Sequence, residues 1–152
     1  MNEKIEKALR VVIKKLKRLN YALIGSVNLS LQGIDIQSRD IDILTNSDEI
    51  NEIVEILKKY QTKEMYFDES EGRNSYRAFF EINGIEIEIL GNVNNACRLK
   101  NSLNKKIYIN YKGIKIPCMP LEEELDVYKK MNREDKIKLI KDKIFKIRKG
   151  IS

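Results

Sequence analysis

An Asp-x-Asp pair in an alternating segment constrains the fold and chemistry of this 152-residue chain more than any other feature. In the segment 40–44, alternation predicts a strand with Ile41 and Ile43 on one face and Asp40 and Asp42 on the other. Two carboxylates side by side on a strand repel each other, and a bound divalent cation reverses that repulsion. Taken alone, the pair is more simply interpreted as a solvated strand edge.

The residues before this pair predict a phosphate-binding turn. The hydrophobic run 21–24 predicts a buried strand, and Gly25-Ser26 then leads into a helix-like segment that ends before Gly33. Backbone N–H groups at such a turn and at a helix N-terminus can bind phosphate. The ordered set of strand, Gly-Ser turn, short helix and Asp-x-Asp strand is far more specific than Asp-x-Asp alone.

The rest of the chain predicts one α/β domain over residues 1–152. Amphipathic periodicity predicts helices over residues 3–19, 46–59, 121–131 and 133–149. Alternation and turn residues predict strands over 62–67, 76–82, 85–90, 107–111 and 114–117. The polar segment 68–75 predicts a surface loop, with a lid over the site as the alternative. We expect a mixed sheet of about five strands, helices packed on one face, and a small C-terminal helical element.

A third carboxylate is available on the strand that follows the Asn83-Gly84 turn. Its isoleucines share one face, so Glu86 and Glu88 share the other. One of the two is the natural candidate for a third carboxylate. Considered alone, Glu88 is more simply a solvent-facing charge.

The stretch 21–45 resembles the signature of the polymerase-β-like nucleotidyltransferase superfamily, in particular its minimal single-domain members in archaea and bacteria. There, a Gly-Ser or Gly-Gly turn precedes Asp-x-Asp, and a later strand supplies a third carboxylate. The resemblance implies that Asp40, Asp42 and Glu88 are catalytic and hold Mg²⁺ (or Mn²⁺). Most relatives carry Asp where this chain has Glu88. It also implies that Gly25 and Ser26 bind the phosphates of an NTP.

The segment 116–144 resembles the C-terminal part of these proteins, in which basic residues hold the NTP phosphates. Lys129 and Arg133 match the basic positions. Arg39, beside the aspartate strand, is a further candidate for phosphate binding, and pairing with an acid is the alternative. For each of these residues separately, an ordinary surface charge is the simpler interpretation.

The implied reaction transfers a nucleoside monophosphate from an NTP to an acceptor, with release of pyrophosphate. The acceptor stays open between a small molecule, a protein side chain and a tRNA or other RNA end. The chain contains no histidine, which excludes histidine-based triads and Cys/His zinc sites but leaves carboxylate–metal chemistry intact. One alternative is a catalytically inactive binding protein of this fold, such as an antitoxin-like partner in a toxin–antitoxin pair.

The net charge of +6 is concentrated at the chain ends. Residues 1–19 carry seven basic and two acidic side chains, and residues 129–149 carry ten and three. A basic RNA-binding module is therefore a third hypothesis. No hydrophobic run approaches the roughly 20 residues of a membrane span, and a signal-peptide core is lacking, so we expect a cytoplasmic protein without a membrane partner. Homo-oligomerisation is left open.

Overall fold

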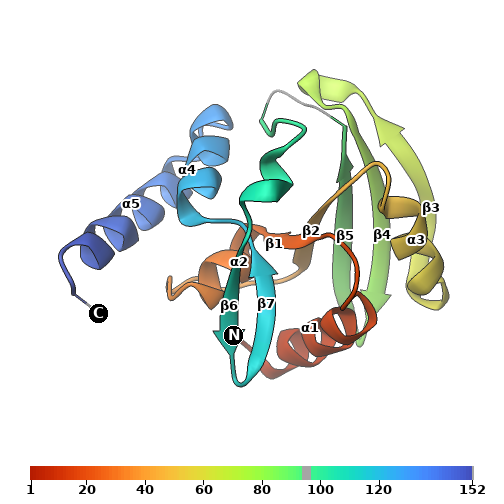
Figure 1. The fold of residues 1–152 in the computed structure, drawn as a ribbon, viewed down its shortest axis with the longest axis horizontal. Helices are drawn as coiled ribbons and strands as arrows, with labels where there is room; N and C mark the ends of the chain where they lie inside the picture. The colour runs from red at the N-terminus through yellow and green to blue at the C-terminus, as the bar shows by residue number, and fades with distance from the viewer. Residues whose placement is uncertain (94–96, 152) are drawn as a thin grey trace.

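The computed structural model describes residues 1–93 and 97–151. A seven-stranded sheet with the order β3-β4-β5-β2-β1-β7-β6 forms its centre (Figure 1). The strands are β1 (Ala22–Ile24), β2 (Ile41–Asn46), β3 (Gln61–Asp68), β4 (Ser75–Ile82), β5 (Ile85–Asn92), β6 (Ile107–Tyr111) and β7 (Ile114–Cys118). The α-helices are α1 (Glu3–Lys15), α2 (Gly25–Leu31), α3 (Ile50–Ile56), α4 (Leu121–Lys130) and α5 (Glu134–Arg148).

The sheet is mixed, as the sequence predicts, but the expectation of about five strands was wrong. Strand β2 runs parallel to β5 and β1 runs parallel to β7, whereas the other neighbours are antiparallel. The β1–β7 pairing joins the β6–β7 hairpin to the strands that carry the acidic residues. Both hairpins have the turns expected from their residues, because Asn83-Gly84 and Lys112-Gly113 adopt positive φ angles.

One face of the sheet carries the main hydrophobic core. Alternate residues of β2 and β5, namely Ile41, Ile43, Ile87 and Ile89, are fully buried there. The hydrophobic stripes of α1 and α3 pack against them. Since side chains of a strand alternate between faces, the acidic residues of β2 and β5 point to the opposite face.

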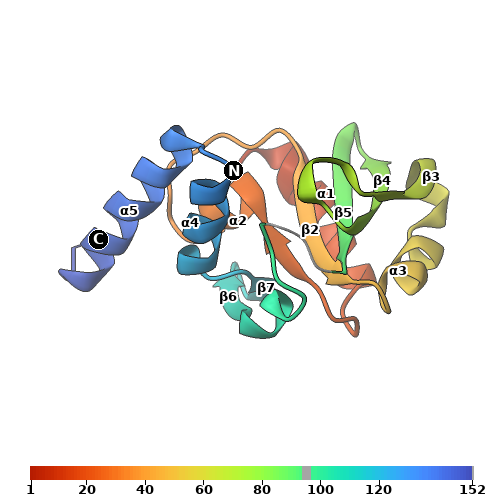
Figure 2. The same ribbon diagram turned by 90° about the horizontal axis from the view of Figure 1, so that it is seen from above.

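Helices α4 and α5 lie at one end of the molecule, and β3 and β4 lie at the other (Figures 1 and 2). A smaller core joins the two helices to α2; it contains Leu29, Leu121 and Ile140. Helix α5 extends away from the sheet (Figure 2). Of the helices in residues 1–93 and 97–151, none is long and apolar enough to cross a membrane.

Candidate active site

Asp42 and Glu88 lie directly beside each other on neighbouring parallel strands. Asp42 of β2 is the register partner of Glu88 of β5, and Ile24 of β1 is its partner on the other side. Residues in register on parallel strands point to the same face, so the two carboxylates share one surface. The Gly25-Ser26 turn (the elbow) directly follows Ile24, so it lies next to Asp42. The fold therefore brings together the Gly-Ser turn and two of the three predicted carboxylates.

Gly25 makes close packing against Asp42 possible. Its φ is +74°, a left-handed conformation that glycine adopts without steric cost. A Cβ atom at this position would lie 2.7 Å from Oδ2 of Asp42, well inside van der Waals contact. The elbow thus needs glycine both for its backbone angle and for the space that the carboxylate occupies.

A buried glutamate from α4 holds the elbow in place. Glu124 is fully buried; its Oε2 accepts a 2.7 Å hydrogen bond from the N–H of Gly25, and its Oε1 pairs with Arg98 at 2.7 Å. The N–H of Gly25, which the sequence assigns to phosphate binding, is therefore already bonded to a side chain of the protein. Helix α2 begins at this residue, with Ser26 in its first turn.

The surroundings of Asp42 destabilise its ionised form. Burial raises its pKa to about 7, and the nearby carboxylates of Asp40, Glu88, Glu124 and Glu86 contribute in the same direction. The cost of ionising Asp42 falls when a cation is bound beside it. The surroundings of Asp42 therefore favour the binding of a cation beside its carboxylate.

Glu88 is paired with an arginine that the sequence analysis missed. Nε and an Nη of Arg77 on β4 approach the same oxygen, Oε2 of Glu88, at 2.6 and 2.5 Å. Arg77 also reaches Oδ2 of Asp68 at 3.2 Å, and Asp68 is buried. Alternation along the hairpin could have revealed the pair, because the Asn83-Gly84 turn fixes which β4 and β5 side chains share a face.

These groups line a cavity of about 550 Å³. Asp42, Glu88 and Gly25 lie on one side, and the end of α4 supplies Lys130 and Arg133. Glu71, Gly72 and Arg73 form part of the rim, so the segment 68–75, predicted as a loop with a lid as the alternative, borders the site.

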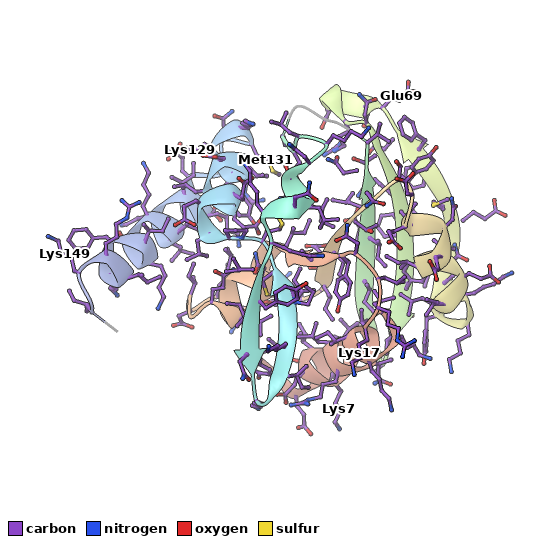
Figure 3. All side chains as sticks on the ribbon, viewed as in Figure 1. Lys7, Lys17, Glu69, Lys129, Met131 and Lys149 are labelled. Carbon is purple, nitrogen blue, oxygen red and sulfur yellow. The ribbon has the colours of Figure 1, made fainter. Side chains whose placement is uncertain are left out.

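The structure does not bring every predicted residue to the cavity. Lys129 is exposed near the end of α4 beside Met131 (Figure 3) and is not among the lining residues; its neighbour Lys130 takes that place. Arg39 is exposed and also lies outside the lining, as do Ser26 and Asp40. Asp40 is half-buried just before β2, and its charge still affects Asp42.

The carboxylates fit a divalent cation that is shared with a nucleotide. Within residues 1–93 and 97–151, no group of three or more Asp, Glu or Cys side chains is arranged to hold a metal ion. Asp42 and Glu88 nevertheless supply two hard oxygen ligands on adjacent rigid strands. Magnesium is commonly bound in this way, by one or two carboxylates with substrate phosphates and water completing its shell.

Comparison with known proteins gives a family and a fold. A family model described as aminoglycoside-2''-adenylyltransferase matches residues 8–141. No protein curated for its function matches the sequence. A candidate nucleotidyltransferase of Thermotoga maritima has a similar structure, with 28% identity, a TM-score of 0.76, and coverage of 93% of this chain and 92% of that one.

Two antibiotic-modifying enzymes share the fold. The lincosamide antibiotic adenylyltransferase LnuA, solved with lincomycin, has 20% identity and a TM-score of 0.63, covering 92% of this chain and 98% of its own. ANT(2")-Ia, solved with adenylyl-2"-tobramycin, has 10% identity and a TM-score of 0.52, covering 93% and 97%. These similarities agree with the resemblance seen in the sequence.

Proposed function

The chain belongs to the aminoglycoside-2''-adenylyltransferase family, within the polymerase-β-like nucleotidyltransferases, and we propose that it transfers the adenylyl group of ATP to a hydroxyl of a small molecule. The observation that carries this proposal is the pairing of Asp42 with Glu88 beside the Gly25 elbow. The two residues face a cavity that also contains the basic side chains of Lys130 and Arg133.

In the proposed reaction, the acceptor oxygen forms a bond to the α-phosphorus of ATP while the bond from that phosphorus to the bridging oxygen breaks. Pyrophosphate leaves, and the proton of the acceptor hydroxyl is released to solvent. A divalent cation, Mg²⁺ or Mn²⁺, would neutralise the charge that develops on the phosphates. Asp42 and Glu88 would hold it, with Asp40 adding negative charge from the start of β2. The chain's contribution is positioning and charge complementarity, which needs no histidine.

Lys130 and Arg133 are assigned to the pyrophosphate part of ATP. Lys130 is the last residue of α4 and Arg133 directly precedes α5. Both line the cavity that the carboxylates line, and both carry charge of the sign that phosphate requires. We assign to Lys130 the phosphate-binding role that the sequence suggested for Lys129, because Lys130 lines the cavity and Lys129 does not. Ser26 stays a candidate phosphate contact through its position in the first turn of α2.

The choice of a small-molecule acceptor rests on the relatives and on the cavity. LnuA and ANT(2")-Ia were solved with lincomycin and with an adenylylated tobramycin. The cavity volume of about 550 Å³ is of the size that small-molecule sites have. The RNA-binding hypothesis has less support, because Lys7 on α1 and Lys17 just after it lie far from Lys149 at the end of α5 (Figure 3).

The test is incubation with α-labelled ATP and Mg²⁺ together with lincomycin, tobramycin or bulk tRNA. Transfer of label to a small molecule, lost in Asp42→Asn and kept in the exposed-residue control Asp35→Asn, supports the proposal. Label on tRNA or on the protein itself would replace the proposed acceptor class. Nucleotide binding without any transfer would favour the alternative of a binding protein that has lost the chemistry.

A further inference from the structure

The ion pair between Arg77 and Glu88 has a feature that ordinary surface ion pairs lack. Both guanidinium contacts go to one oxygen, Oε2, at 2.5 and 2.6 Å. Glu88 is the register partner of Asp42, so Arg77 places its positive charge on one of the two carboxylates assigned to the cation.

Several contacts hold Arg77 in this position. Asp68, a buried residue at the end of β3, accepts a 3.2 Å hydrogen bond from Nη1 of Arg77. The guanidinium carbon lies 5.2 Å from the ring centroid of Phe79 and 5.9 Å from that of Tyr66. A side chain already held by Asp68 and by two rings loses little additional freedom when it binds Glu88.

The length of Glu88 matches this partner. Arg77 is in register with Leu90, so it reaches Glu88 diagonally across the β4–β5 pair. An aspartate at position 88 would be one methylene shorter and would withdraw from this contact. The departure from the usual aspartate therefore has a physical reason within this chain.

We propose that Arg77 acts as a built-in counter-cation at Glu88, so that the site binds its divalent cation together with the nucleotide and only weakly without it. This inference rests on the proposed function and concerns how the same site is loaded. The guanidinium occupies one carboxylate oxygen and repels a second cation, and Asp42 alone is a weak ligand set. The triphosphate brings negative charge that offsets this repulsion.

The test measures Mn²⁺ binding by electron paramagnetic resonance, with and without a non-hydrolysable ATP analogue. For the unaltered protein we expect weak binding of Mn²⁺ alone and clearly tighter binding with the analogue. Arg77→Met should tighten the binding of Mn²⁺ alone by at least about tenfold, because a charge at contact distance in a partly buried site is poorly screened. Arg77→Gln, which keeps a donor for Asp68, is the second variant in case the first does not fold.

Arg73→Gln is the matched control. Arg73 lines the same cavity and pairs with Glu71 at 3.3 Å and with Asp68 at 3.8 Å. Its removal changes the cavity charge by the same amount and should leave Mn²⁺ binding within about twofold, since exposed ion pairs contribute little. The double variant Arg77→Met with Glu88→Gln should lose the gain, because the carboxylate that was released is then absent.

The possible results separate this inference from the proposed function. Equal Mn²⁺ affinity in the unaltered protein and in both Arg77 variants would overturn the counter-cation role while leaving nucleotide binding intact. An equal gain from Arg73→Gln would also overturn it, because the effect would then be general cavity charge. Failure of the unaltered protein to bind Mn²⁺ even with the ATP analogue would instead reject the proposed function.

Discussion

The carboxylate of Asp42 fills the space beside Gly25, so that a Cβ atom at position 25 would be 2.7 Å from Oδ2 of Asp42. This contact couples the turn that begins α2 to the residue at the centre of the proposed site. A substitution at Gly25 must therefore displace Asp42 or bend the elbow.

Gly25→Ala should destabilise the protein more than Gly84→Ala does. Both glycines have similar positive φ angles, +74° and +78°, but a Cβ at Gly84 would meet nothing within 4 Å. Backbone strain of about 1–2 kcal/mol is common to both, and the clash at Gly25 should add at least about 1 kcal/mol. Urea unfolding measures the difference. Equal losses in the two variants would show that the contact with Asp42 has no energetic consequence.

Glu124→Ala should cost about 3–5 kcal/mol of stability, because it removes a buried carboxylate that pairs with the buried Arg98 and accepts from the N–H of Gly25. Glu124→Gln keeps an acceptor oxygen and should cost less. Glu122→Ala, at an exposed position of the same helix, should change stability by less than about 0.5 kcal/mol. Thermal and chemical unfolding measure the stabilities of these three variants. A Glu124→Ala variant as stable as Glu122→Ala would contradict the role of Glu124 in holding the Gly25 turn.

Asp42 should make the stability of the cation-free protein depend on pH. Its pKa rises from 3.8 to about 7 on folding, so the folded protein binds this proton more tightly than the unfolded chain. The stability is therefore greatest below pH 4 with respect to this group, and is lost as the pH rises towards 7. The full loss is roughly 4 kcal/mol.

Asp42→Asn removes that penalty. Its melting temperature relative to the unaltered protein should rise between pH 4.5 and about pH 7, and level off above that, when no divalent cation is present. Asp35→Asn, at an exposed position, should show no such trend. If the difference in melting temperature between the two proteins did not change with pH, the pKa of Asp42 would not be raised in the folded protein.

The basic residues near the end of α4 test whether ATP is bound by Lys130 or by its neighbour Lys129. Lys130→Ala and Arg133→Ala should each weaken ATP binding by about tenfold, because charge-assisted contacts to phosphate are strong. Lys129→Ala should leave it nearly unchanged, since Lys129 lies outside the cavity. Calorimetric titration of ATP into the three variants measures these losses. A larger loss of affinity in Lys129→Ala than in Lys130→Ala would restore the assignment of Lys129 made from the sequence.

Much of the fold follows from local patterns. The isoleucines of β2 and β5, the Asn83-Gly84 turn and the stripe of α1 identify their elements correctly, because period and turn chemistry are local properties. The ends are less exact, since α1 ends at Lys15 rather than at residue 19 and β5 continues to Asn92. The number of strands in one sheet was underestimated. The parallel pairing of β1 with β7 is a long-range contact, and the residues of neither strand specify its partner.

The site was predicted less completely, for a related reason. Glu124 belongs to a run of three glutamates that favours the start of a helix, and its buried role depends on its position on the same face as Leu121 and Tyr128. Arg98 pairs with Glu124 of a distant helix, so no nearby residue marks it. Arg77 could have been found from the register of the β4–β5 hairpin. Lys129 and Lys130 differ by one helical step, which a sequence pattern of basic residues does not resolve.

The central claim is that Asp42 and Glu88 together hold the cation that binds the triphosphate. Calorimetric titration with a non-hydrolysable ATP analogue and Mn²⁺ tests it most directly, on the unaltered protein, Asp42→Asn, Glu88→Gln and the control Asp35→Asn. We predict that the first two variants lose the Mn²⁺-dependent part of the affinity, by at least about tenfold each, while circular dichroism shows an intact fold and the control binds normally. Unchanged Mn²⁺-dependent binding in the folded Asp42→Asn variant would contradict the account.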